Sequence, residues 1–200
     1  MFEMLMKGGW IMVPLAACSL LAVTIIVERL IFFRMIGLHQ PADDVLTLVE
    51  QGRYEEALAK TERFNLPVVK VLKAGLGYRR DPVKAMEVAG LSEISTMKRG
   101  LTVLETIITL SPLLGLLGTI IGMIGSFQIM TISGTSQPHA VTGGVAEALI
   151  ATATGITVAV ITLIPYNYFL RRVEQETETI EQYATRFELA FNESLQERTG

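Results

Sequence analysis

Residues 106–131 read Thr-Ile-Ile-Thr-Leu-Ser-Pro-Leu-Leu-Gly-Leu-Leu-Gly-Thr-Ile-Ile-Gly-Met-Ile-Gly-Ser-Phe-Gln-Ile-Met-Thr and contain no charged residue. The charge-free run continues to Ala146 and is 41 residues long. A helix needs about 20 mostly apolar residues to cross the hydrocarbon core of a bilayer. The run is therefore too long for one span, and the turn-forming residues Ser133-Gly-Thr-Ser-Gln-Pro138 divide it into two.

Two more charge-free runs cover residues 8–27 and 148–170. Half of the 200 residues are hydrophobic and only 18% are charged, against roughly 25% in soluble domains. We therefore predict an all-α membrane protein in which long helices extend into the cytoplasm and a helical insert lies between two spans. The expected transmembrane helices are residues 9–33, 101–131 and 142–170.

The orientation follows from the basic residues that flank the three spans. Six of them fall on one side of the membrane: Arg29, Arg34, Lys98, Arg99, Arg171 and Arg172. The positive-inside rule makes that side cytoplasmic. The expected segments are an external N-terminus at 1–8, a cytoplasmic helical region at 34–100, a short external loop at 132–141 and a cytoplasmic C-terminal helix at 171–200.

The cytoplasmic segments have the apolar periodicity of helices. No strong helix breaker follows Pro82 before Pro112, so we expect one long helix to run from the cytoplasm into the second span. The tail after Arg172 repeats apolar residues at spacings of three and four, including Phe187 and Phe191. Such a face must be covered, either by self-association or by the chain's own cytoplasmic region, and the two alternatives are equally compatible with the pattern.

Several classes of function do not fit the composition. The net charge is −3, so a nucleic-acid-binding surface is not expected. Cys18 is the single cysteine, and neither His39 nor His139 has a companion at metal-ligand spacing, so we expect no metal site and no cofactor. An enzyme needs a nucleophile with a base, or paired acids. The third span has one glutamate and no histidine, so we do not expect an enzyme.

The second span is rich in small residues, which allow helix backbones to approach closely in lipid. The glycines are Gly115, Gly118, Gly122 and Gly125. On an ideal helix Ser111, Thr119 and Ser126 fall within about 40° of Gly115, on one narrow stripe. The stripe fits either helix packing alone or a pore lined by hydroxyl groups.

Glu147 is an acid inside the third span. A charge at that depth costs about 2.5–3.5 kcal/mol on a translocon scale, and no lysine or arginine occurs between Arg99 and Arg171 to offset it. Thr154 lies about 20° from Glu147 on an ideal helix, so hydroxyls accompany the acid on one face. We regard Glu147 as a functional candidate, although its shallow depth also fits a carboxylate that reaches the interface.

Two motifs resemble the MotA/TolQ/ExbB proton-channel family. They are Pro112-Leu-Leu-Gly-Leu-Leu-Gly-Thr119-Ile-Ile-Gly-Met-Ile124 and Gly144-Val-Ala-Glu147-Ala-Leu-Ile-Ala-Thr152-Ala-Thr-Gly155. The likeness covers nearly the whole chain and is greatest to ExbB- and TolQ-like subunits. One departure is Ile161, which stands where the family often has a proline.

The resemblance implies a subunit of a bacterial inner-membrane motor, with a periplasmic N-terminus and a cytoplasmic C-terminus. Such subunits form a homo-oligomer, a pentamer, around a single-span ExbD- or TolR-like partner that carries an intramembrane aspartate. The proton motive force is then coupled to a TonB- or TolA-like protein. The resemblance implies that the pore-lining positions of the family are Thr119, Glu147 and Thr152 in this chain. The helical wheel instead favours Thr154 as the residue beside Glu147. A non-conducting scaffold and a sodium-driven motor are the alternatives.

Overall fold

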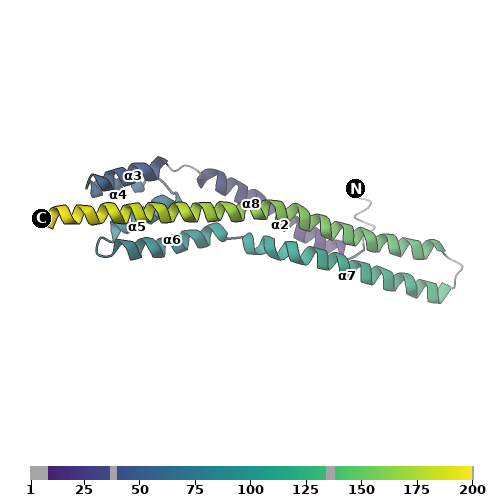
Figure 1. Ribbon diagram of the computed structural model, residues 1–200. Coiled ribbons are helices and arrows are strands. Elements are labelled where there is room, and N and C mark those ends of the chain that lie inside the picture. The colour runs from purple at the N-terminus through teal and green to yellow at the C-terminus, as the bar shows by residue number, and fades with distance from the viewer. Residues whose placement is uncertain (1–8, 37–39, 134–137, 200) are drawn as a thin grey trace. The chain divides into compact units, whose positions relative to one another are not determined.

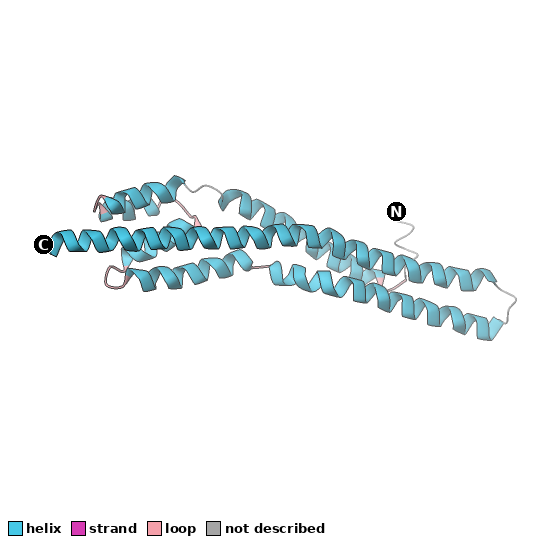
Figure 2. Ribbon diagram, in the orientation of Figure 1, coloured by secondary structure: helices cyan, strands magenta, loops and turns pink. Residues whose placement is uncertain are grey.

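The structure is a computed structural model that describes residues 9–36, 40–133 and 138–199. Every regular element in these ranges is a helix (Figures 1 and 2). In chain order the helices are α2 (Met12–Ile36), α3 (Gln40–Glu50), α4 (Tyr54–Thr61), α5 (Pro67–Gly77), α6 (Pro82–Lys98), α7 (Leu101–Ser133) and α8 (Pro138–Thr199).

Three of these helices, α2, α7 and α8, contain stretches long and apolar enough to cross a membrane. The chain is thus an all-α, multi-pass membrane protein, as its charge-free runs predict. Pro112 and Pro165 lie inside α7 and α8 without ending them. The expected external N-terminus at 1–8 and most of the turn between Ser133 and Pro138 lie outside the described residues.

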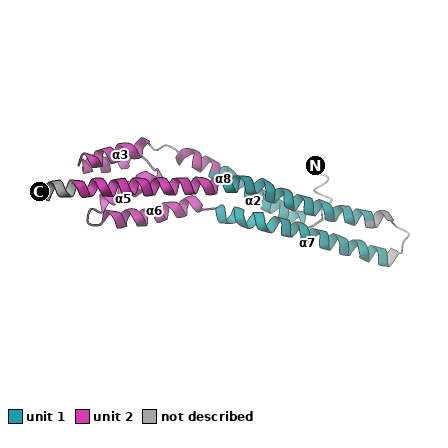
Figure 3. Cartoon of the chain, in the orientation of Figure 1, with its two compact units in different colours: residues 1–29, 100–168 teal, residues 30–99, 169–200 magenta. Residues whose placement is uncertain are grey.

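The chain divides into two compact units (Figure 3). The membrane unit comprises residues 1–29 and 100–168, and the helical unit comprises residues 30–99 and 169–200. α2 and α8 contribute residues to both units. The third span and the C-terminal helix, which we expected as separate segments, are consecutive parts of the single helix α8.

The prediction of one long helix starting at Pro82 is wrong. α6 ends at Lys98 and α7 begins at Leu101. Between them Gly100 has φ +79°, a left-handed conformation that favours glycine. A glycine just after a helix often ends it in this way, so the single Gly100, which looks tolerable inside a helical pattern, is the breaker.

Large apolar side chains form the core of the helical unit. Phe187 of α8 is fully buried and stacks on Phe191, whose ring packs edge-on against Tyr54 of α4. The ring centroids lie 5.9 Å and 5.8 Å apart. Of the two alternatives for the apolar face of the tail, the structure supports packing on the chain's own helical unit.

A hydrogen bond from Tyr183 also joins α8 to α3. Its hydroxyl donates to Asp43 Oδ1 at 2.6 Å, and Arg186 pairs with both Asp43 and Glu50. Burial, followed by the hydrogen bond to Asp43, raises the pKa of Tyr183 to about 12. The tail is therefore attached to the helical unit by polar as well as apolar contacts.

Candidate functional site

Three of the four predicted packing glycines lie where α7 meets α8. A Cβ atom on Gly115 would lie 3.0 Å from the Ala151 carbonyl oxygen and from Thr152 Cα. A Cβ on Gly118 would lie 2.5 Å from Ala151 Cβ. These positions require glycine because the two backbones approach too closely for any side chain.

The glycine packing stops at the end of this contact that lies nearest the connection between α7 and α8. A Cβ on Gly122 would lie 2.9 Å from Ala148 Cβ and 3.1 Å from the Gly144 carbonyl oxygen. A Cβ on Gly125 would meet nothing within 4 Å. Gly125 therefore takes no part in this contact, although the sequence pattern groups it with the other three.

The glycine contact brings together the hydroxyls of Thr119 and Thr152. Their Oγ1 atoms lie 3.2 Å apart, and the Thr152 hydroxyl also lies 3.0 Å from the Gly115 carbonyl, to which it can donate. The Thr119 hydroxyl donates to the Leu116 carbonyl at 2.6 Å. A hydroxyl has one donor and two acceptor sites, so these two oxygen atoms, whose protons are directed at carbonyls, can still accept hydrogen bonds.

Thr154 lies on a different side of α8. With Thr157, Thr162 and Ser19 it lines a mostly apolar groove of about 380 Å³ between α2 and α8. Its hydroxyl donates to the Ile150 carbonyl of its own helix at 2.8 Å. The structure thus separates Thr154 from the Thr119–Thr152 pair.

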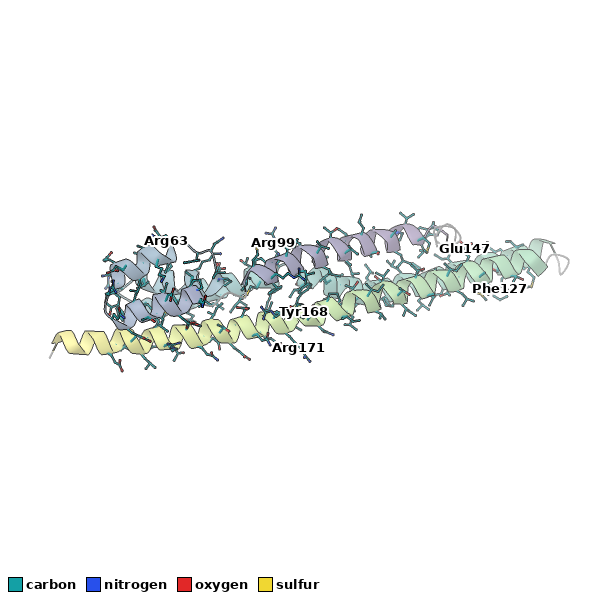
Figure 4. The ribbon with its side chains drawn as sticks, turned by 90° about the horizontal axis from the view of Figure 1, so that it is seen from above. Arg63, Arg99, Phe127, Glu147, Tyr168 and Arg171 are labelled. Carbon is teal, nitrogen blue, oxygen red and sulfur yellow. The ribbon has the colours of Figure 1, made fainter. Side chains whose placement is uncertain are left out.

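Glu147 lies apart from the Thr119–Thr152 pair, on the side of α8 that contacts the start of α2. It is half-buried, and its carboxylate lies against Gly9, just before the first turn of α2. Figure 4 labels Glu147 on α8. Five residues separate Glu147 from Thr152, which corresponds to about 7.5 Å along the axis and about 140° around it. Within one chain the acid and the hydroxyl pair are therefore separate parts of the candidate site.

Gly9 is a residue of the site that the sequence pattern does not reveal. Its carbonyl accepts the Met12 N–H at 3.1 Å, and its φ is +71°. A glycine pair just before Trp10 was the available signal, but such a pair indicates only a turn. No periodicity relates Gly9 to a residue more than a hundred positions away.

Sequence comparison matches these helices to a known family of membrane proteins. The sequence profile of the MotA/TolQ/ExbB proton channel family matches residues 67–182, more than half of the chain. A Synechocystis protein named biopolymer transport protein ExbB-like 3 is 37% identical over 194 residues, which cover 93% of this chain and 92% of that protein.

Two other relatives carry similar names. An ExbB homolog from Methanothermobacter thermautotrophicus is 35% identical and matches 90% of this chain and 66% of its own length. The biopolymer transport protein ExbB of Helicobacter pylori is 39% identical over 82 residues, which are 41% of this chain and 57% of that protein. The similarity to the first relative extends over all three apolar helices.

Proposed function

Because the chain belongs to the MotA/TolQ/ExbB proton channel family, we propose that it is the proton-conducting subunit of an inner-membrane motor. The subunit acts as a homo-oligomer, a pentamer, with a single-span ExbD- or TolR-like partner. Protons that enter through the complex drive work on a periplasmic or outer-membrane protein, as in ExbB- and TolQ-like systems. The subunit is not an enzyme, and its N-terminus is periplasmic.

The observation that carries this proposal is the contact between the Thr119 and Thr152 hydroxyls. Most other threonine hydroxyls of the membrane unit donate to carbonyls of their own helix, as Thr154 and Thr157 do. Thr119 also donates within its own helix, to the Leu116 carbonyl, but its oxygen lies 3.2 Å from the Thr152 hydroxyl of α8. Thr152 in turn donates across the contact to the Gly115 carbonyl of α7. Oxygen atoms that line a membrane pathway can replace the hydration shell of a passing ion.

Glu147 supplies the ionisable group of the proposed pathway. An ionisable residue within a span is a functional candidate by default because it is costly to keep there. Glu147 exchanges a proton near the outer end of α8, and the two threonines provide polar oxygen atoms further in. The partner's intramembrane aspartate completes the pathway.

Proton flux into liposomes that contain the complex with its single-span partner tests the proposal. Glu147→Ala and Thr119→Ala are expected to abolish flux while the oligomer still assembles. Thr157→Ala is the matched control, because Thr157 is exposed and its hydroxyl donates to the Ala153 carbonyl of its own helix at 2.7 Å. If both pathway variants keep full flux, the pore assignment is wrong.

The same liposomes distinguish the alternatives. A scaffold assembles with its partner but passes no ions under any gradient. A sodium-driven motor passes ions under a sodium gradient and is insensitive to a pH gradient. The assignment of Thr152 rather than Thr154 to the pathway is tested by Thr154→Ala, which should leave the flux unchanged.

A further inference from the structure

The start of α2 lies against the Glu147 carboxylate. A Cβ atom built on Gly9 would collide with Glu147 Oε1 and lie 3.2 Å from its Cδ. Gly9 also has φ +71°, which residues with a side chain rarely adopt. The backbone conformation therefore favours a glycine here, and any side chain at this position would have to displace the Glu147 carboxylate.

The start of α2 is firmly packed against the rest of the membrane unit. Ile11, Met12 and Leu15 are buried, with at most 6% of each residue exposed. Leu114 and Ile121 of α7 pack against this cluster. Since these apolar contacts anchor the first turn, the position of Gly9 beside Glu147 does not depend on a single contact.

The second and third spans contain no basic residue that could pair with Glu147. No lysine or arginine occurs between Arg99 and Arg171. The turn at Gly9 lies directly against the Glu147 carboxylate and reduces its exposure to water on that side.

We propose that Gly9 is a positioning residue for Glu147. The turn that begins α2 holds the carboxylate in one orientation and covers one side of it, which sets how readily Glu147 exchanges a proton. The importance of this control for ion passage rests on the proposed function, whereas the contact itself does not. A side chain at position 9 would displace the carboxylate and expose it.

Labelling with dicyclohexylcarbodiimide tests the proposal on the full-length protein in liposomes. This apolar reagent modifies protonated carboxyl groups, and mass spectrometry measures the rate at Glu147 as a function of pH. Gly9→Ala is expected to increase the rate several-fold and to shift the midpoint of its pH profile. Gly52→Ala is the matched control, because Gly52 has φ +70° but open space around its Cβ position.

Two additional variants separate positioning from backbone strain. Asparagine tolerates positive φ, so Gly9→Asn adds a Cβ with less strain and should also shift the profile, and it replaces Gly9→Ala if that variant does not fold. Glu147→Asp shortens the acid and should make labelling insensitive to Gly9→Ala. The difference between the effects of Gly9→Ala in the parent and in the Glu147→Asp background measures the coupling between the two residues.

The inference is overturned if Gly9→Ala and Gly9→Asn both leave the labelling rate and pH midpoint unchanged. It is also overturned if Gly52→Ala changes them equally, or if Gly9→Ala acts identically with Glu147→Asp. Proton flux is measured on the same variants. If the parent protein passes no protons but Gly9→Ala shifts the labelling profile, only the proposed function is contradicted. If flux is normal but Gly9→Ala does not change the labelling of Glu147, only this inference is contradicted.

Discussion

The membrane unit and the helical unit pack by opposite means. In the membrane unit, α7 and α8 meet through Gly115, Gly118 and Gly122, where a Cβ would lie within 2.5–3.0 Å of the other helix. In the helical unit, α8 meets its neighbours through large side chains such as Phe187 and Phe191. In water the burial of apolar area drives association, but lipid is as apolar as leucine, and helices in it associate through close approach.

The polar contacts differ in the same way. In the helical unit the ion pair Lys60–Asp44 connects α4 to α3, and Arg79–Glu55 connects the turn after α5 to α4. In the membrane unit the hydroxyls of Thr119 and Thr152 form one contact across α7 and α8, and the Tyr166 hydroxyl of α8 hydrogen-bonds Glu105 of α7. Charges are costly in lipid, so the membrane unit can place hydroxyls where the helical unit places ions.

The largest expected effect on stability comes from a substitution in the core of the helical unit. Phe187→Ala removes a fully buried ring and should lower the free energy of unfolding by about 3–5 kcal/mol. Thermal unfolding of the purified protein, followed by circular dichroism, measures this loss. Leu189→Ala is the control, because Leu189 is 61% exposed on the same helix, and an equal loss there would contradict the described core.

The second prediction concerns the glycine contact. Gly115→Leu forces a side chain against the backbone of α8 and should destabilise the membrane unit by about 1–3 kcal/mol or more. Gly125→Leu adds the same side chain to α7 in open space and should have little effect. Melting temperatures in detergent compare the two, and equal losses would show that close approach is not what α7 requires.

The third prediction uses pH. The folded protein raises the pKa of Tyr183 from its usual value near 10 to about 12. The stabilisation that the Tyr183 hydroxyl contributes to the fold is therefore fully present below pH 10, and it is lost as the pH rises from 10 to about 12. Tyr183→Phe should cost about 1 kcal/mol at neutral pH and should abolish this part of the decline. If the parent and the variant lose stability in parallel above pH 10, the bond to Asp43 does not contribute.

The smallest expected effect on stability comes from the hydroxyl contact in the membrane unit. Thr152→Val keeps the shape of the side chain and removes its hydrogen bonds, at a cost of about 0.6 kcal/mol, the average for contacts of this kind in lipid. Thr157→Val, at an exposed position, is the control. A marginal loss of stability together with a large loss of proton flux would separate the role of Thr152 in conduction from its role in packing.

The sequence predicts the membrane elements well because lipid imposes a simple rule. A span must be long, apolar and helical, so charge-free runs are sufficient to find α2, α7 and α8. The helix that we expected to continue through Gly100 is the exception. A glycine either continues or ends a helix according to the contacts around it, and a Cβ on Gly100 would lie 3.1 Å from Ile25 Cγ2, a contact that no local pattern reveals.

The candidate site was less predictable. Helical spacing places Thr119 and Gly115 on one stripe, but it cannot identify which residue of α8 faces them. The wheel relates Thr154 to Glu147, whereas the structure pairs Thr152 with Thr119 and places Thr154 in the α2 groove. An angle on one helix contains no information about the neighbouring helix.

By itself the sequence determined the class of this protein: three apolar helices, an expected orientation, and an acid in a pair of spans that contains no basic residue. Only the tertiary structure decided which groups meet: Thr119 with Thr152, and Glu147 with Gly9. The physical reason is that burial in lipid depends on composition, which is local. Contacts between side chains depend on how closely backbones approach, and that distance is set jointly by residues far apart in the chain.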